Sequence, residues 1–437
     1  MGTKTQKLSN VVDQIVEWQS VVVADGSTNT TGVSGRGYFV DTSAGAHTVN
    51  LPASPKIGDV IKVSLITAGN ALTIGRNGNN INGSASDITT STDGDSFELV
   101  YVNASEGWKS VGQIQGGAFI SATGGTVTTS GDYKIHSFTG DGCFVVSTLG
   151  NANTNPAGGP STVDYLVVAG GGAGGLNIPN NSGMGGGGGA GGFRESSGAA
   201  SGCYTASPLG ACVSGITVTA TTYPITVGAG GASILYPANS DAPGNPGSNS
   251  IFSTITSTGG GGGGNIFSGS DHTTGGCGGS GGGSSQVLDG SGTPPGGSGN
   301  TPPVSPPQGN NGGGSGPNNI NGAGGGGGAG SAGANGVGPA PCGTGGAGGA
   351  GVSSSITGSP IGYAGGGGGA GNATRGAANP VGGGGNGMSY TVLGSTGTAN
   401  TGGGGGGVTG PNPSYNTPTC GSLSGGKGIV IIRYKFQ

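Results

Sequence analysis

Short, pure runs of glycine recur through the last two thirds of this chain and constrain its fold more than any other feature. They lie at residues 170–172, 185–189, 259–264, 324–328, 365–369, 382–385 and 402–407. A run of five or six glycines has no side chains to bury, and it loses more conformational entropy on ordering than any other sequence. Such a run can be ordered only if its N–H and C=O groups find partners in other segments.

Composition favours packing over disorder for this region. Glycine makes up 113 of the 437 residues, which without a strict repeat is typical of low-complexity segments. However, only nine residues from Tyr165 onward are charged, and the runs alternate with segments rich in Tyr, Ile, Val and Phe. Because solvated disorder normally relies on charge, we expect the glycine-rich region to pack against itself.

One backbone arrangement satisfies a glycine run. Left-handed helices of the polyproline II type have three residues per turn and rise about 3.1 Å per residue, and their peptide groups can bond to neighbouring helices. Only glycine permits such close contact on all sides, so we expect a bundle of polyglycine II helices roofed by apolar segments at 223–231, 249–264 and 354–369. A valine in place of Gly326 should then disrupt folding.

The amino terminus has a different pattern. Leu8, Val11, Val12 and Ile15 fall on one stripe of a helix over residues 8–18. A helix of this length is marginal alone, so we expect it to dock against a partner, a second copy or the core of its own subunit.

The fold class that follows is mainly β. We expect an N-terminal helical attachment segment over 1–20 and a small all-β sandwich or barrel over 21–115, where short strands alternate with turn residues. A β-stranded transition over 116–169 then leads to a glycine-rich polyglycine II domain over 170–437 with flanking strands.

The final strand shows alternation. Val430, Ile432 and Tyr434 alternate with Ile431 and Arg433, which predicts a half-buried strand.

Residues 163–175, "VDYLVVAGGGAGG", have the glycine spacing of a dinucleotide-binding turn. That motif needs a helix directly after the glycines, because the pyrophosphate binds the N–H groups of its first turn. Here Pro179 and the run 185–189 forbid a helix. In that motif an acidic residue about 20 positions further on ends a second strand and binds the ribose. Glu195 has this spacing, but it lies among glycines and serines and is not expected to end a strand. We therefore expect a strand that leads into the glycine array.

Charge and hydropathy exclude further classes. The net charge of −4 with no basic block argues against a nucleic-acid partner. The longest apolar stretches are far shorter than the roughly 20 residues of a membrane span, so we expect no membrane insertion. No signal peptide is expected either.

The six cysteines contain no C-x-x-C pair and predict no zinc site. They are expected as buried thiols, with a disulfide between Cys203 and Cys212 as the alternative.

Catalysis has little support. His47, His136 and His272 lie far apart in the sequence, and after residue 165 the acidic residues are Glu195, Asp241, Asp271 and Asp289. We expect no enzyme activity, no cofactor and no metal.

Several motifs together resemble a known family. The segments "DYKIHSFTGDGCFVV", "VDYLVVAGGGAGG" and "YPITVGAGG", followed by glycine runs and a closing "GGKGIVIIRY", are similar to the glycine-rich domain of tailed-bacteriophage tail fibres. The runs also resemble those of receptor-binding adhesins with a polyglycine II sandwich. Residues 36–111 resemble a small β domain of marine phage fibres. Those adhesins are separate proteins that sit on a fibre, whereas here a β domain is fused upstream of the glycine-rich region. The way in which the adhesins attach, and their number of copies, are therefore not transferred to this chain.

This resemblance implies a viral function. The protein would be a tail-fibre adhesin in the virion, assembled in the host cytoplasm, that binds a glycan or an outer-membrane protein of a bacterium. The receptor-contacting loops would lie at 176–184, 194–215, 265–274, 284–321, 371–381, 386–401 and 408–424. Their aromatic residues are the candidate receptor-binding residues, Tyr204, Phe267, Tyr390 and Tyr415.

The fibre analogy also implies a homotrimer that contacts other tail or baseplate proteins through its N-terminal part. The alternative is a non-adhesive structural spacer or decoration protein of the virion, with the glycine helices as a rigid rod.

Overall fold

The protein is mainly β. The computed structural model describes residues 16–114, 118–151, 159–176, 183–201, 204–210, 212–234, 243–265, 273–286, 293–316, 322–338, 342–379, 381–410 and 421–437. No helix occurs in these segments. The chain divides into two compact units: unit 1 comprises Met1–Ile120 and Thr148–Ser161 with Gln437, and unit 2 comprises Ser121–Ser147 and Thr162–Phe436.

The described residues of unit 1 form ten strands in two sheets. They are β1 (Glu17–Trp18), β2 (Val22–Val23), β3 (Thr30–Thr31), β4 (Arg36–Asp41), β5 (His47–Asn50), β6 (Val60–Thr67), β7 (Leu72–Gly75), β8 (Ile88–Thr90), β9 (Ser96–Asn103) and β10 (Gly107–Ile114). One sheet has the order β1-β4-β6-β9-β10 with β2 beside β4, and the other has the order β3-β5-β7-β8.

The chain of unit 1 coils between these sheets. From β2 to β7 it alternates from one sheet to the other, so β4 pairs parallel with β6, and β5 pairs parallel with β7. Only β8, β9 and β10 add antiparallel pairs at the end of the coil.

Alternate residues of these strands fill the space between the two sheets. On β6, for example, Ile61, Val63 and Leu65 are fully buried, while Lys62 and Ser64 between them are partly exposed. Trp108 on β10 is also fully buried in this core.

The predicted N-terminal helix over 8–18 lies largely outside the described residues, which begin at residue 16. The last two residues of that stretch, Glu17 and Trp18, form β1 and pair parallel with β4.

The described part of unit 2 has thirteen strands. They are β11 (Ser121–Thr123), β12 (Thr126–Ser130), β13 (Tyr133–Phe138), β14 (Gly142–Thr148), β15 (Thr162–Val168), β16 (Phe193–Glu195), β17 (Ile216–Thr217), β18 (Thr222–Thr226), β19 (Ser250–Phe252), β20 (Ile255–Ser257), β21 (Val352–Ser354), β22 (Ile361–Tyr363) and β23 (Ile429–Lys435). One sheet has the order β12-β13-β23-β15-β16 with β17 beside β15, a second has the order β11-β14-β18-β19-β20, and β21 pairs with β22. We call these strands the strand base.

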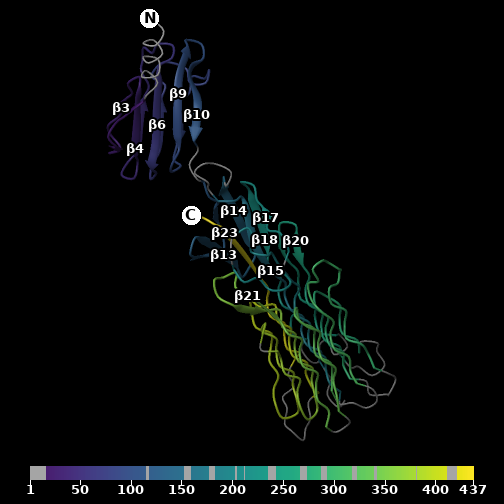
Figure 1. The fold of residues 1–437 in the computed structure, drawn as a ribbon. Helices are drawn as coiled ribbons and strands as arrows, with labels where there is room; N and C mark the ends of the chain where they lie inside the picture. The colour runs from purple at the N-terminus through teal and green to yellow at the C-terminus, as the bar shows by residue number, and fades with distance from the viewer. Residues whose placement is uncertain are drawn as a thin grey trace, which may run out of the picture. The chain divides into compact units, whose positions relative to one another are not determined.

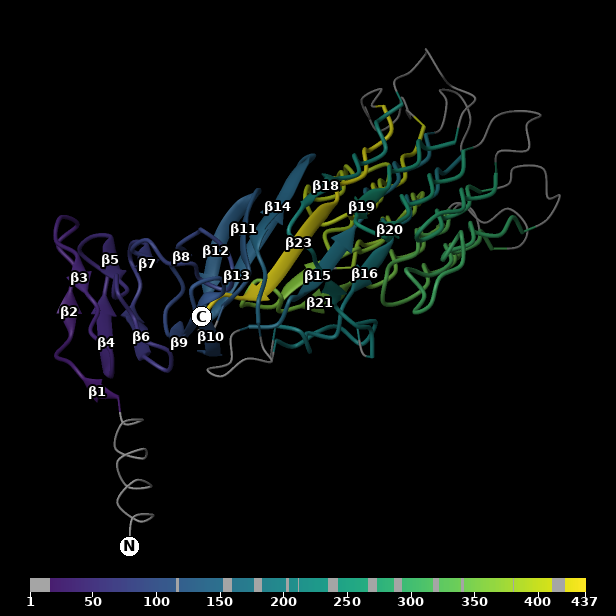
Figure 2. The same cartoon turned by 90° about the horizontal axis from the view of Figure 1, so that it is seen from above.

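The C-terminal strand β23 occupies the centre of its sheet, between β13 and β15 (Figure 2). Its residues Ile429 to Tyr434 are all buried, including Ile431 and Arg433. The expectation of a half-buried strand is therefore wrong. Both faces are covered, because Tyr434 packs toward Phe144 of the second sheet while Ile431 packs with Tyr363 of the β21–β22 pair.

Some of the glycine runs adjoin the ends of these strands, as 170–172 does after β15 and 259–264 after β20, and the runs lie side by side (Figures 1 and 2). The run 185–192, which leads into β16, shows how they are bonded. Its first, fourth and seventh N–H groups donate to carbonyl groups of the segment 402–408. The second, fifth and eighth donate to carbonyl groups of 258–264, and the third and sixth to carbonyl groups of 324–327. The N···O distances lie between 2.8 and 3.1 Å. Partners therefore repeat every three residues.

The carbonyl groups of the same run follow the same repeat with three other neighbours. They accept N–H groups from the segments 367–370, 169–175 and 280–283. One run is thus bonded to six others, and its ordering depends on main-chain groups alone.

Candidate functional site

The strand base holds a buried carboxylate, Asp164, in the middle of the apolar strand β15. Its oxygens accept the Ser196 hydroxyl at 2.6 Å, the Gly198 N–H at 3.2 Å, and both the N–H and the hydroxyl of Ser201 at 2.6 Å. The Ser196 hydroxyl oxygen in turn accepts the N–H of Tyr165 at 2.9 Å. Asp164 thereby fastens the segment 196–201 to the sheet. The sequence analysis missed this site, although an aspartate inside "VDYLVV" is a signal that could have found it.

Glu195 forms a second buried acidic position. Its carboxylate accepts the Ser207 N–H at 2.8 Å and the Ser354 hydroxyl, so it joins three separate segments. Burial raises the pKa of Glu195, although the bonds from Ser354 and Ser207 oppose this shift. Glu195 is the last residue of β16, which corrects the expectation that it would not end a strand.

The glycines with dinucleotide-like spacing belong to the hydrogen-bonded array. The Gly172 N–H donates to Gly189 at 2.8 Å, and a Cβ on Gly172 would lie only 2.2 Å from the carbonyl oxygen of Gly261. The positions around this glycine are therefore filled by neighbouring backbones. A phosphate has no room there.

Tyr204 lies beside the strand base. Its hydroxyl donates to the Ser196 carbonyl at 3.0 Å, its ring packs against the core beside β23, and burial raises its pKa. The Arg433 guanidinium lies over the rings of Tyr204, at 5.4 Å, and Tyr133, at 4.5 Å, and donates to the Ile356 carbonyl at 3.1 Å. Burial lowers the pKa of Arg433.

Two small apolar clusters lie at the far end of the runs, by which we mean the ends away from the strand base. Met184, Ala323 and Ala370 each adjoin the end of a glycine run and pack together. Leu176, Ile234, Met388 and Val408 form the second cluster. Apolar side chains thus cover the array where it ends.

Tyr390 belongs to this far end. Its half-buried ring packs against the cluster of Met184, Ala323 and Ala370. The other two candidate aromatic residues, Phe267 and Tyr415, lie outside the described residues. The structure therefore places Tyr204 and Tyr390 at opposite ends of the runs and does not bring them together.

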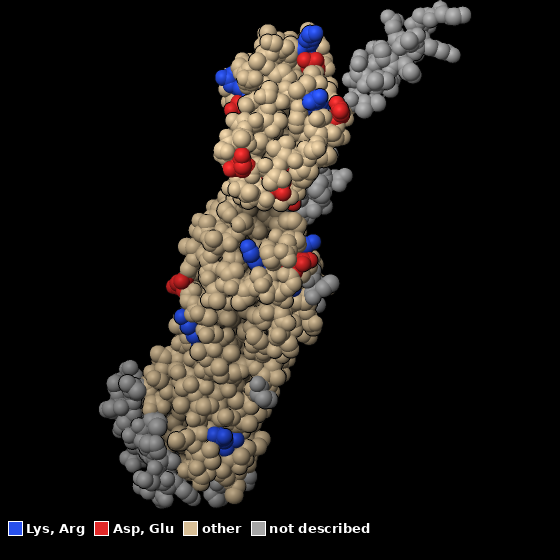
Figure 3. Space-filling model, turned by 90° about the vertical axis from the view of Figure 1, so that its left-hand side faces the viewer, with Lys and Arg blue, Asp and Glu red and all other residues tan. Residues whose placement is uncertain are grey.

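Figure 3 shows how the charged side chains of the described residues are distributed on one face. On the face shown in Figure 3, acidic and basic residues are spread over unit 1 and the strand base, and only a basic patch lies over the glycine runs. Arg375 is a charged residue of this region, and its guanidinium donates to the Leu393 carbonyl at 2.6 Å.

The cysteines do not lie where the sequence analysis expected them. Cys143, Cys212, Cys277 and Cys342 are exposed free thiols, so the expectation of buried thiols is wrong for these four. Because Cys212 is free, the alternative disulfide with Cys203 is not formed; Cys203 itself lies outside the described residues.

Metal-ligating side chains do not gather in the described part of the chain: no three His, Cys, Asp or Glu residues are close enough to hold an ion. In the same residues, no helix has the length and apolar character that a membrane span requires.

His136 is a buried base between the sheets of unit 2. Its Nδ1 lies 2.6 Å from the Gly124 carbonyl oxygen and its Nε2 lies 3.1 Å from the Tyr434 hydroxyl, with the ring edge against Phe144. Burial lowers the pKa of His136 below its ordinary value of 6.5, although the Gly124 bond opposes this shift.

We expect unit 2 to lose stability as the pH falls below 6.5. Below that value His136 is protonated in the unfolded chain but stays neutral in the folded chain, because its folded pKa is lower. The free energy of unfolding therefore falls by up to about 1.4 kcal/mol per pH unit until the folded pKa is reached. Hydrogen exchange of unit 2 peptides across this range measures the slope. His136→Gln keeps a donor and an acceptor and should flatten it, and an unchanged slope in that variant would contradict the assignment.

Comparison with known proteins places the chain by its glycine-rich part. No curated protein matches the sequence at a significant level. Residues 146–435 match the family model described as a glycine-rich domain, and this match takes in the strand base from β15 to β23 and all the runs between them. Since the match spans well over half of the sequence, the chain belongs to the glycine-rich domain family.

Proposed function

We propose that the glycine runs of unit 2 form a bundle of polyglycine II helices. The observation that carries this proposal is the three-residue repeat of hydrogen-bond partners along 185–192, with the N–H groups directed to three neighbours and the carbonyl groups to three others. A helix with three residues per turn presents its peptide groups in three directions, which is the pattern that the repeat requires. At about 3.1 Å per residue, this run would span about 25 Å.

We further propose that the protein is a bacteriophage tail-fibre adhesin that binds a receptor on the bacterial surface. Membership of the glycine-rich domain family is compatible with a glycine-rich fibre protein. The physical argument is that a bundle bonded through its backbones fixes the ends of its helices, and so holds the joining segments in place for contact. A prepositioned surface loses less entropy on binding.

The proposed receptor surface is the far end of the bundle. Tyr390 packs there, and the segments that contain Phe267 and Tyr415 follow the runs that end near it. Tyr204 bonds to the Ser196 carbonyl beside the strand base, so we do not include it in this surface. The N-terminal part would attach the protein to other tail or baseplate proteins in the virion, as a homotrimer.

We expect the full-length protein, labelled with a fluorophore, to bind intact cells of its host and to compete with phage adsorption. The double variant Phe267→Ser and Tyr415→Ser should weaken cell binding about tenfold or more, because aromatic residues often dominate such contacts. A matched control is Val127→Ser, which removes an exposed apolar side chain on β12 of the strand base. Flow cytometry over a panel of bacterial strains gives the measurement.

The outcome that contradicts the adhesin proposal is a folded protein that binds no strain that the phage infects. In that case the bundle would act only as a spacer.

A further inference from the structure

Unit 1 has a cavity of about 480 Å³ that the proposed receptor surface does not use. It lies between β8, the edge strand of the four-stranded sheet, and β9 and β10 of the larger sheet. Its lining residues are Ala71, Asn82, Ile88, Thr89, Thr90, Ser91, Thr92, Asp95, Phe97 and Ser110. Cavities of this size, about 300–1,000 Å³, are typical of small-molecule sites.

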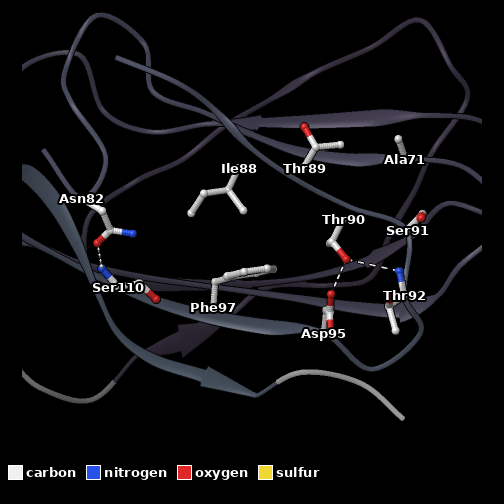
Figure 4. Close-up of a pocket in the computed structure, with 10 residues that line it drawn as sticks. All are labelled: Ala71, Asn82, Ile88, Thr89, Thr90, Ser91, Thr92, Asp95, Phe97 and Ser110. Atoms are coloured by element: carbon white, nitrogen blue, oxygen red, sulfur yellow. Dashed lines mark hydrogen bonds between the residues drawn. The ribbon is translucent and has the colours of Figure 1, made fainter. Parts of the chain in front are cut away.

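Figure 4 shows how the apolar and polar groups divide this cavity. Ile88 and the ring of Phe97 face each other across its middle. Both residues also belong to the packed core of unit 1, with Ile88 partly buried against it, so this apolar part is held in place.

One polar end is formed by Asn82 and Ser110. The Asn82 side-chain oxygen accepts the Ser110 N–H at 3.1 Å, which fixes the orientation of the amide (Figure 4). Its NH₂ group, which has two donor hydrogens, has no partner among the described side chains. Asn82 has a φ of 53°, a left-handed conformation that asparagine tolerates better than most residues.

The other polar end is formed by Thr90, Thr92 and Asp95. The Thr90 hydroxyl donates to the buried Asp95 carboxylate and accepts the Thr92 N–H at 3.2 Å (Figure 4). A carboxylate offers about four acceptor positions, and each hydroxyl is both a donor and an acceptor. The two ends therefore supply donors and acceptors on either side of an apolar middle.

We propose that this cavity binds a neutral saccharide of one or two rings. A sugar ring has an apolar face of C–H groups, which suits Ile88 and Phe97, and hydroxyls around its edge that can bond at both polar ends. Asp95 is the only charged residue among the ten that line the cavity. The lining therefore lacks a cation that would favour an acidic sugar or a phosphate.

This site is separate from the proposed function, because it lies in unit 1 and the receptor surface lies in unit 2. Loss of saccharide binding should leave adsorption through the far end intact, so the two proposals fail independently.

The test uses the full-length protein and the methyl glycosides of glucose, galactose, mannose and N-acetylglucosamine. We expect saturation-transfer NMR to detect binding of at least one of them, and isothermal titration calorimetry to give its dissociation constant. Asn82→Asp keeps the oxygen that accepts the Ser110 N–H and the tolerance of a positive φ but removes the amide donors. It should weaken binding about tenfold, as should Thr92→Val.

Thr48→Val is the matched control, because it removes a hydroxyl from β5 at a position that does not line the cavity. It should bind as the unchanged protein does. Near-UV circular dichroism of buried Trp108 verifies that each variant is folded. The proposal is overturned if none of the four glycosides binds at millimolar concentration, or if both cavity variants bind as tightly as the control.

Discussion

Replacing Gly326 by valine is expected to prevent unit 2 from folding. A Cβ at this position would lie 1.9 Å from the Gly188 carbonyl oxygen and 2.9 Å from the Gly189 nitrogen. Both atoms belong to a neighbouring backbone that is itself bonded, since Gly188 donates to Gly405 at 2.8 Å and accepts from Gly367 at 2.9 Å. The clash cannot be relieved by turning a side chain. It must separate two runs and break their bonds.

The expected loss of stability for this variant is above about 5 kcal/mol, which exceeds the usual range for single substitutions and is comparable to the whole stability of many domains. Hydrogen exchange of unit 2 peptides measures it. Both tryptophans, Trp18 and Trp108, lie in unit 1, so their fluorescence reports that unit separately and should be unchanged.

Three further substitutions test the steric argument. Gly326→Ala should be nearly as damaging as valine, because the Cβ alone makes the clash. Gly140→Ala should be close to neutral, since the nearest atom to a Cβ there is the flexible Lys427 Nζ at 3.6 Å. Val392→Ala, at a side chain that is 45 % exposed, should also cost little. Tolerance of valine at Gly326 would refute a close-packed array.

Part of this fold could be predicted from the sequence because it depends on residue type alone. Glycine runs with few charges predicted that main-chain groups would have to satisfy one another, and the bonding of run 185–192 agrees with that reasoning. Strands such as β6 could also be predicted from residue type, because apolar residues at every second position indicate a strand with one buried face.

The rest depends on which segments meet, and this information is not local. β23 alternates as if one face were open, but its central place in the sheet buries Arg433 as well as Ile431. The six neighbours of run 185–192 range in the sequence from the nearby segment 169–175 to the distant segment 402–408, and residues without side chains carry no code for this pairing. Tyr390 could be proposed from composition, but its packing against Met184, Ala323 and Ala370 could not.

Asp164→Ala is expected to destabilise unit 2 by about 4 kcal/mol or more. The substitution leaves the Ser196 hydroxyl, the Gly198 N–H and two donors of Ser201 without their acceptor. Each unsatisfied buried donor costs about 1–3 kcal/mol, and the surrounding sheet gives these groups little access to water. Asp164 and Ser201 are both almost completely buried.

A graded series distinguishes this bond network from the cost of a simple cavity. Ser201→Ala removes one hydroxyl donor to Asp164 and should cost about 1 kcal/mol. Asp164→Asn keeps the shape of the side chain and one acceptor oxygen, but its NH₂ group would face the donors of Ser196 or Ser201 and could not accept from them. Its loss of stability should therefore be intermediate. Urea unfolding followed by hydrogen exchange of the β15 peptide gives the order. If Asp164→Asn were as stable as the unchanged protein, the carboxylate would not be what fastens residues 196–201 to the strand from which the first glycine run continues.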